Sequence, residues 1–345
     1  MSVLALRSRS TTPSTRAVRV TDRGLGPVRP VRIVFVAGTG RSGSTLLTML
    51  LGSLPDTVAV GELRYLWERG LVEHRLCGCG MPVPECALWK SILDRTFDGE
   101  MPANVDDAID AVDWIGSTAN LPHLLRRPSS IRPIGDFPLL LGRLYRSVAD
   151  TTKARTIVDS SKPPTYGWLL GTLPGVELSV VHLVRDPRGA AFSWLRPKAA
   201  SDRPSGGYMP QKAVWKSALN WSVWNLATEL LFRGRTHRML RVRYEDLVAD
   251  PEQTLASVLE FIGQPGDALG GLHDRRVDVH TSHTVAGNPS RLVNGPTVLE
   301  PDTAWESQLS AASRRVVTVL TAPLLHHYGY RLRHRGLGRP DRRQA

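Results

Sequence analysis

The stretch from Val31 to Thr45 constrains the fold more than any other part of the chain. It reads Val-Arg-Ile-Val-Phe-Val-Ala-Gly-Thr-Gly-Arg-Ser-Gly-Ser-Thr, and an apolar run of helical type follows from Leu46 to Leu51. We therefore expect a buried strand, a glycine-rich turn and the start of a helix. Such a turn directs several backbone N–H groups and a helix N-terminus at one point, which suits a phosphate or sulfate group.

Strands and helices alternate along the rest of the chain. Further strands are expected over residues 58–60, 156–158, 176–184 and 237–242. Helices are expected over about 44–54, 63–73, 136–152, 165–173, 189–195, 212–233, 251–262 and 305–326. The alternation predicts an α/β fold with a P-loop-type, mainly parallel sheet flanked by helices. Short helical pieces and prolines over 98–135 predict a helical cap insertion.

The net charge of +12 is concentrated at the two ends of the 345-residue chain. Residues 1–30 and 331–345 each hold six Arg and one Asp, which leaves the body near +2. We expect residues 1–30 to be a disordered basic segment and 331–345 a basic tail, on either side of one domain over 31–330. An arm for an acidic surface is the alternative. No aromatic residue in 1–30 could stack on a base, so no nucleic-acid partner is expected.

No apolar run approaches the roughly 18–20 residues that a membrane span needs. The N-terminus has Arg7 and Arg9 but no hydrophobic core after them, as a secretory signal would have. We therefore expect a cytoplasmic protein without a membrane span.

Three cysteines lie close together between residues 74 and 90. His74, Cys77, Cys79 and Cys86 could supply four tetrahedral zinc ligands, although the spacing is not that of a well-known zinc finger. A disulfide from Cys86 to Cys77 or Cys79 is a second interpretation, which a reducing compartment disfavours. Unlinked thiols are the third.

The turn after the first strand departs from that of ATP-binding proteins. Gly38-x4-Gly43 matches the start of a nucleotide-binding P-loop, in which Lys and then Ser or Thr follow. Here Ser44 stands in the place of the lysine, and the cation, Arg41, lies inside the loop. No acidic strand end is evident that would help Thr45 to hold magnesium. A kinase or ATPase would lose much of its electrostatic stabilisation in this way, so the pattern favours an anion held without a metal.

Two motifs resemble those of sulfotransferases that use 3′-phosphoadenosine 5′-phosphosulfate (PAPS). The run Gly40-Arg41-Ser42-Gly43-Ser44-Thr45-Leu46 resembles their 5′-phosphosulfate loop. The run His182-Leu183-Val184-Arg185-Asp186-Pro187-Arg188, with Ser193 eight residues after Arg185, resembles their 3′-phosphate motif. A guanidinium at a strand end and a hydroxyl two turns into the next helix can converge on one phosphate. The resemblance covers about residues 31–330 and is closer to the tyrosylprotein and carbohydrate enzymes than to the cytosolic phenol and steroid enzymes, which carry Lys where Arg41 stands.

The resemblance implies transfer of the sulfuryl group of PAPS to an acceptor hydroxyl, without a required metal, leaving adenosine 3′,5′-bisphosphate (PAP). The acceptor would be a carbohydrate, a glycolipid or a small natural product, with a protein tyrosine as the further alternative. Cofactor contacts are implied for Gly40, Arg41, Ser42, Gly43, Ser44, Thr45, Arg185 and Ser193. Tyr244 would pack near the cofactor or in the core. Arg291 lies in the segment 287–295, where the family closes a loop over the cofactor, although the sequence of that segment departs from the family's patterns.

Three side chains are the candidate catalytic residues. Glu62 follows a short strand and is the candidate base, since a pocket that excludes water would raise its pKa. A carboxylate that stabilises a helix start is the alternative for Glu62. Lys162 matches the lysine that, in sulfotransferases, stabilises the oxygen bridging the sulfuryl group and the leaving phosphate. Arg41 is the first cation of the site.

Two other functions remain open at this stage. One is a P-loop small-molecule kinase, and the other is a non-catalytic nucleotide-binding protein. Trp215, Trp221 and Trp224 on the helix expected over 212–233 fit either core packing or the wall of an acceptor pocket. The cap over 98–135 and the Pro/Gly/Ser-rich loop over 197–210 are the segments expected to select the acceptor.

Overall fold

A computed structural model of the chain describes residues 30–126, 134–234, 238–265, 272–273, 275–279 and 282–332. The segment expected to be disordered, 1–30, lies outside the described residues except for residue 30. The expected basic tail, 331–345, lies outside them except for its first two residues. Positions 127–133 of the expected cap and position 237, where the last strand was expected to begin, also lie outside.

Five parallel strands form the central sheet, in the order β2-β3-β1-β4-β5. They are β1 (Val31–Gly38), β2 (Thr57–Gly61), β3 (Thr156–Lys162), β4 (Val176–Val184) and β5 (Arg238–Arg243). The expected α/β fold with a mainly parallel sheet is confirmed. Because all five strands run the same way, their carboxyl ends lie along one edge of the sheet, where open α/β sheets bind ligands.

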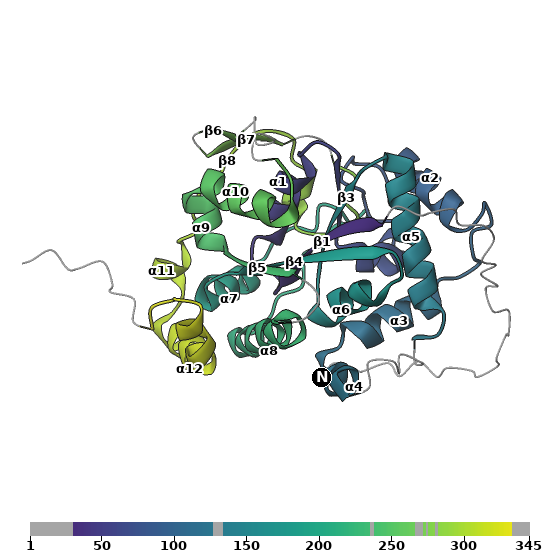
Figure 1. The fold of residues 1–345 in the computed structure, drawn as a ribbon. Coiled ribbons are helices and arrows are strands. Elements are labelled where there is room, and N and C mark those ends of the chain that lie inside the picture. The colour runs from purple at the N-terminus through teal and green to yellow at the C-terminus, as the bar shows by residue number, and fades with distance from the viewer. Residues whose placement is uncertain are drawn as a thin grey trace, which may run out of the picture.

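Helices cover both faces of the sheet, and β1 is buried between them (Figure 1). Successive side chains of β1 point to opposite faces, so Ile33 and Phe35 join one hydrophobic cluster and Val34 and Val36 the other. The first face is covered by α2 (Ala87–Thr96), α3 (Asp106–Gly116), α5 (Phe137–Thr152) and α6 (Pro164–Thr172). The second face is covered by α1 (Ser44–Gly52), α9 (Tyr244–Ala249) and α10 (Pro251–Ile262).

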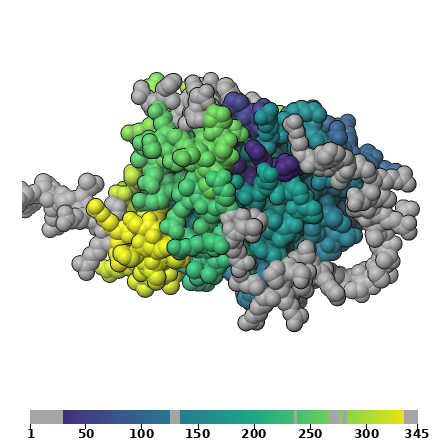
Figure 2. Space-filling model, in the orientation of Figure 1, coloured from purple at the N-terminus to yellow at the C-terminus, as the bar shows by residue number. Residues whose placement is uncertain are grey.

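The remaining helices follow β4 and close the C-terminal part of the fold. They are α7 (Pro187–Leu195), α8 (Val214–Phe232), α11 (Trp305–Gln308) and α12 (Ala311–His327). In the space-filling view, the yellow C-terminal segment packs against the green one (Figure 2). Helix α12 contacts α8, and the Ser222 hydroxyl donates a hydrogen bond to the Leu320 carbonyl at 3.4 Å. No helix within the described ranges is long and apolar enough to cross a membrane.

Some short elements differ from the sequence expectation. The helix expected over 63–73 is a 3-10 turn, η1 (Leu63–Tyr65), followed by a π-helix, η2 (Leu66–Val72). A small antiparallel sheet of β6 (Leu272–His273), β7 (Arg276–Val279) and β8 (Gly295–Val298) was not expected at all. The expected cap contains α3, η4 (Thr118–Asn120) and α4 (Leu121–Arg126), and α3 packs on α6 beside the sheet.

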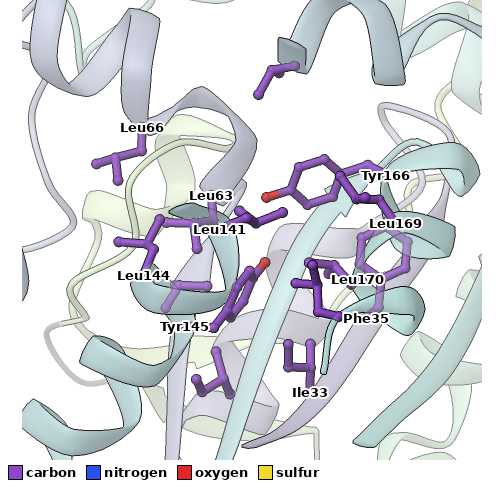
Figure 3. Packing of buried hydrophobic residues seen from close by; sticks show 14 of the residues in the cluster. Ile33, Phe35, Leu63, Leu66, Leu141, Leu144, Tyr145, Tyr166, Leu169 and Leu170 are labelled. Atoms are coloured by element: carbon purple, nitrogen blue, oxygen red, sulfur yellow. The ribbon is translucent and has the colours of Figure 1, made fainter. Parts of the chain in front are cut away.

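Several polar side chains lie within the first hydrophobic cluster, next to the carboxyl end of β3. Figure 3 shows the hydroxyls of Tyr145 and Tyr166 pointing toward the same space. The Tyr145 hydroxyl donates to Asp159, which also accepts from the Ser161 backbone N–H at 2.6 Å. Burial raises the pKa of Asp159 to about 6. The Ser161 hydroxyl then accepts from the Arg64 N–H at 3.1 Å, so this buried network reaches the turn that follows β2.

The contact of α6 with β1 can be tested at Gly167, where a Cβ atom would lie 2.4 Å from the ring of the fully buried Phe35. We expect Gly167→Ala to destabilise the protein by about 1–3 kcal/mol through overpacking. Gly142 of α5 is the matched control, because a Cβ atom there would meet nothing within 4 Å. Gly142→Ala should stabilise the protein by about 0.5–1 kcal/mol, since alanine loses less backbone entropy in a helix. Urea unfolding measures both, and a Gly167→Ala protein as stable as wild type would contradict this packing.

Candidate active site

A cleft of about 430 Å³ opens at the carboxyl edge of the sheet. Each of the five strands leads to a residue that lines it: Arg41 after β1, Glu62 after β2, Lys162 in β3, Arg185 after β4 and Tyr244 after β5. The structure therefore brings together the residues that the sequence placed at separate strand ends.

The turn between β1 and α1 forms one wall of the cleft. Gly43 has a φ of 90°, and a Cβ atom there would lie 2.4 Å from the ring of Tyr244. Only glycine fits this position, for both reasons. The Ser42 hydroxyl donates to the Thr39 carbonyl at 2.8 Å and closes the turn. Helix α1 begins at Ser44, and Gly40, Arg41, Gly43, Ser44 and Thr45 all line the cleft. The turn and the helix N-terminus fit a phosphate-bearing group.

Arg41 lies inside this turn with its backbone in the left-handed region, at a φ of 68°. Its guanidinium lies 4.9 Å from the ring centroid of Trp194 and 3.5 Å from the Met209 sulfur. Burial lowers the pKa of Arg41, and the charge of Glu62 opposes this effect. The guanidinium remains charged at neutral pH, because arginine does not deprotonate in proteins.

Glu62 and Lys162 form a buried ion pair on the other side of the turn. The Lys162 Nζ lies 2.5 Å from Glu62 Oε1, and the two side chains are only 8% and 12% exposed. Lys162 has a φ of 80°, a strained conformation of the kind found at functional sites. The Glu62 N–H donates to the Ala286 carbonyl at 3.3 Å, and the Glu62 carbonyl accepts from the Tyr65 N–H at 3.0 Å. The backbone of Glu62 is thus held in place through both its N–H and its carbonyl.

The pKa of Glu62 differs from the sequence expectation. Burial by itself raises this pKa, as expected, but the charge of Lys162 and then that of Arg64 outweigh it. The pKa of Glu62 therefore lies below its ordinary value, and the side chain is a carboxylate at neutral pH. Burial lowers the pKa of Lys162, while Glu62 opposes this shift. The charge of each partner thus favours the charged form of the other.

Arg185 forms a second cationic corner next to the turn. Its backbone carbonyl accepts from the Trp221 indole N–H at 2.9 Å, and its guanidinium lies 4.4 Å from the ring centroid of Tyr244. One Arg185 nitrogen donates to the Arg41 carbonyl at 3.1 Å and the other to Asp302 at 3.0 Å. Ser193 of α7 also lines the cleft. This corner already holds a carboxylate from the chain itself, so it accommodates negative charge.

Cations predominate in the cleft. The Lys and Arg residues that line it are Arg41, Arg64, Arg69, Arg75, Lys162, Arg185, Arg196, Lys198, Arg203 and Lys212. Among the described lining residues, the carboxylates are Glu62 and Asp302. Glu62 pairs with Lys162, and Asp302 pairs with both Arg185 and Arg196. Each carboxylate thus already has a cationic partner, which suits a multiply charged anion better than a magnesium–nucleotide complex.

The segment between α7 and α8 contributes several of these cations and contains the loop over 197–210 that was expected to select the acceptor. It folds back on itself, since the Met209 N–H donates to the Lys198 carbonyl at 2.7 Å and Ala200 donates to Gly207 at 2.9 Å. Asp202 fixes it to the body of the protein: the Asp202 carbonyl accepts from the Leu76 N–H at 2.8 Å. No local motif in the sequence identified the cations of this loop as part of the site.

Arg291 does not take the expected place. Its buried guanidinium donates to the carbonyls of Thr284 and Leu76, at 2.7 and 2.6 Å, and lies 3.4 Å from Asp202. These partners hold it behind the cleft, and we assign it a structural role in place of the expected cofactor contact. The loop around it does reach the cleft through Asn288, whose N–H donates to the Thr45 hydroxyl at 3.1 Å.

The three tryptophans of α8 have different environments. Trp221 is buried and supports Arg185, Trp224 lines the cleft, and Trp215 is 49% exposed. Core packing therefore applies to Trp221, and a place for Trp224 in the wall of an acceptor pocket stays a prediction. Among the described residues of 98–135, none lines the cleft.

Comparison with known protein families identifies one match, to the model of the sulfotransferase family over residues 138–268. The matched range includes Lys162, Arg185, Ser193 and Tyr244, whereas Arg41 and Glu62 precede it. The match confirms the resemblance to sulfotransferases over this range, which includes the second of the two motifs. The preference for the tyrosylprotein and carbohydrate type stays a prediction.

Several solved structures are similar to this chain, whereas no curated protein matches it. One is the sulfotransferase domain of the olefin synthase of Synechococcus PCC 7002, at 22% identity over 88% of this chain and 97% of that one, with a TM-score of 0.46. Another is the sulfotransferase domain of the curacin biosynthetic pathway, at 18% identity over 89% and 100%, with a TM-score of 0.45. A third is the sulfotransferase STF9 of Mycobacterium avium, at 14% identity over 89% and 79%, with a TM-score of 0.47.

The coupling between Glu62 and Lys162 can be measured by carboxyl NMR titration. In wild type, Glu62 should titrate below the ordinary value of 4.5. In Lys162→Met, burial is no longer opposed by the lysine charge, so the pKa of Glu62 should rise above that value. Lys153→Met is the matched control, since Lys153 is exposed and also has a positive φ, of 59°. An unchanged Glu62 pKa in a folded Lys162→Met protein would contradict the assigned pairing.

Proposed function

We propose that the chain, which matches the sulfotransferase family over residues 138–268, transfers the sulfuryl group of PAPS to an acceptor hydroxyl. One observation carries this proposal: a glycine-rich turn at a helix N-terminus, a second cationic corner and the buried Glu62–Lys162 pair line the same cleft. PAPS bears negative charge at two separate places, its 5′-phosphosulfate and its 3′-phosphate, and the cleft has a cationic group for each.

The residues around the turn would bind the 5′ end of the donor. Backbone N–H groups of Ser42 to Thr45 at the N-terminus of α1 would bind this end, since Gly43, Ser44 and Thr45 line the cleft, and Arg41 adds a positive charge. Arg185 and Ser193 would bind the 3′-phosphate, and the ring of Tyr244 supports the Arg185 guanidinium. Asp302 pairs with Arg196 as well as Arg185, so it keeps a cationic partner when Arg185 turns to a phosphate.

When bound, PAPS supplies an activated sulfuryl group on a phosphate leaving group. Glu62 would take the proton of the acceptor hydroxyl, whose oxygen forms the new bond to sulfur. Lys162 and Arg41 would stabilise the negative charge that develops on the departing phosphate oxygen. With Lys162 turned to that oxygen, its charge would no longer hold the pKa of Glu62 down, and burial would raise this pKa toward that of an effective base. The strength of the base is thereby linked to the presence of the donor.

The acceptor would enter from the side of the cleft lined by the loop after α7 and by Trp224. We propose a carbohydrate, a glycolipid or a small natural product with a free hydroxyl. The reaction needs no metal, because Arg41, Lys162 and Arg185 supply the positive charge. A P-loop kinase is less compatible with this site, because Ser44 replaces the phosphate-binding lysine and both lining carboxylates have cationic partners.

The identity of the donor can be tested by thermal shift with PAP, magnesium–ATP and GTP. PAP should raise the melting temperature most, since it alone carries a 3′-phosphate. In Arg185→Ala, the affinity for PAP should fall about tenfold or more, because a charge-assisted hydrogen bond is lost. Arg315→Ala, at an exposed position of α12, should bind PAP as wild type does. Stabilisation by ATP or GTP but not by PAP would contradict the proposal.

The role of Glu62 can be tested with Glu62→Gln. This variant should bind PAP like wild type but transfer sulfate about 10²–10⁴-fold more slowly, as expected when a general base is lost. The acceptor for this assay would be identified by mass spectrometry of metabolites from cells with and without the gene. Glu68→Gln, at an exposed position of η2, is the matched control and should keep full turnover. Near-wild-type turnover by Glu62→Gln would eliminate Glu62 as the base.

A further inference from the structure

The three cysteines converge on a histidine that lies far from them in the sequence. One ligand atom from each of Cys77, Cys79, Cys86 and His283 lies within 4.8 Å of the other three. The Cys86 sulfur is 3.3 Å and the Cys77 sulfur 3.8 Å from His283 Nδ1. His74, which the sequence spacing suggested as the fourth ligand, is exposed and does not belong to this cluster.

The distances in this cluster fit a tetrahedral metal site. In a tetrahedron with Zn–S bonds of about 2.3 Å, two sulfur atoms lie about 3.8 Å apart. The Cys79 and Cys86 sulfurs are 3.7 Å apart. This separation is far above the roughly 2.05 Å of a disulfide bond, and all three cysteines are free thiols. A disulfide is therefore not formed in this structure.

We propose that Cys77, Cys79, Cys86 and His283 bind one zinc ion in a structural site. Three thiolates and one imidazole form a ligand set that zinc takes in closed, four-coordinate sites. Cys77 and Cys86 are buried, and Cys79 and His283 are partly buried, so the cluster is closed from most sides. With four protein ligands, no coordination position remains for a substrate, which favours a structural role over a catalytic one.

The backbone around the cluster is already arranged to present these ligands. The Cys77 N–H donates to the Met81 carbonyl at 2.7 Å, and the Gly80 N–H donates to the Cys77 carbonyl at 2.9 Å. These bonds form a tight turn that carries Cys77 and Cys79. On the opposite side, the buried Trp89 donates its indole N–H to the His283 carbonyl at 2.7 Å. Hydrogen bonds of this kind, from groups that do not bind the metal themselves, orient the metal ligands and increase the affinity of the site for the metal.

The proposed zinc would join two distant parts of the chain next to Glu62. Residues after His283 run along the end of β2: the Val285 N–H donates to the Val60 carbonyl at 3.0 Å, and the Ala286 carbonyl accepts from Glu62. The Gly78 N–H donates to the Thr284 carbonyl at 2.9 Å. A metal at His283 would therefore hold this segment against β2. The zinc site stands whether or not the proposed function is correct, because it rests on the cluster alone.

The test is the metal content of the full-length protein purified in reducing buffer without chelators. We expect about one equivalent of zinc, and, after exchange for Co²⁺, the visible absorption of a tetrahedral cobalt–thiolate centre. Either Cys79→Ser or His283→Asn should lower zinc affinity by more than the roughly 10–100-fold typical of an outer-shell change, and should lower the melting temperature. His74→Asn is the matched control, since asparagine tolerates its positive φ of 51°, and it should keep the metal.

Three results would overturn the proposal. They are a folded wild-type protein that contains no zinc and binds no Co²⁺, a Cys79–Cys86 disulfide found by mass spectrometry, and iron in place of zinc. The measurements on wild type decide the question even if the ligand variants fail to fold. PAP binding by the zinc-containing protein separates the two proposals. A protein that holds zinc but binds no PAP would contradict only the proposed function.

Discussion

The position of β1 between β3 and β4 is the constraint on which the site depends. All three strands are parallel, and the register sets Ala37 opposite Lys162 on one side and Gly38 opposite Leu183 on the other. The turn after β1 therefore opens between Lys162 and Arg185. Hydrogen bonding within the sheet places the glycine-rich turn and its two flanking cations, because the strands leave little freedom at their ends. The same sheet brings Glu62 to the cleft from β2, on the far side of β3.

Burial by itself raises the pKa of Glu62 and lowers that of Lys162, and their contact at 2.5 Å opposes both shifts. A buried ion pair is weak evidence for stability, because desolvation of the two charges offsets much of their attraction. The pair is, however, well suited to a reaction in which Lys162 leaves Glu62 for a phosphate. A phosphate that draws Lys162 away leaves a buried carboxylate with a raised pKa. In the proposed reaction, the arrival of the donor thus prepares the base, and the cost of burying the pair serves catalysis.

The parts of this protein that were predictable from sequence are those with local signals. The five strands, the turn at Gly43 and the strand-end positions of Glu62, Lys162 and Arg185 follow from patterns within a few residues. Contacts between distant segments left no such signal. Arg291 is satisfied by carbonyls of Leu76 and Thr284, and His283 meets cysteines about 200 residues earlier, which spacing along the chain cannot indicate. The sequence predicted a raised pKa for Glu62, because nothing in it showed that Lys162, 100 residues later, would pair with this carboxylate.

The central claim is that the cleft recognises a nucleotide with phosphates at both its 5′ and 3′ positions. Calorimetric titration of wild-type protein with PAP and with adenosine 5′-monophosphate tests it most directly, since the two ligands differ only in the 3′-phosphate. The account predicts that PAP binds roughly 10–100-fold more tightly, because Arg185 makes charge-assisted hydrogen bonds to that group. Equal affinity for the two nucleotides would contradict the assignment of Arg185 and, with it, the identification of the donor.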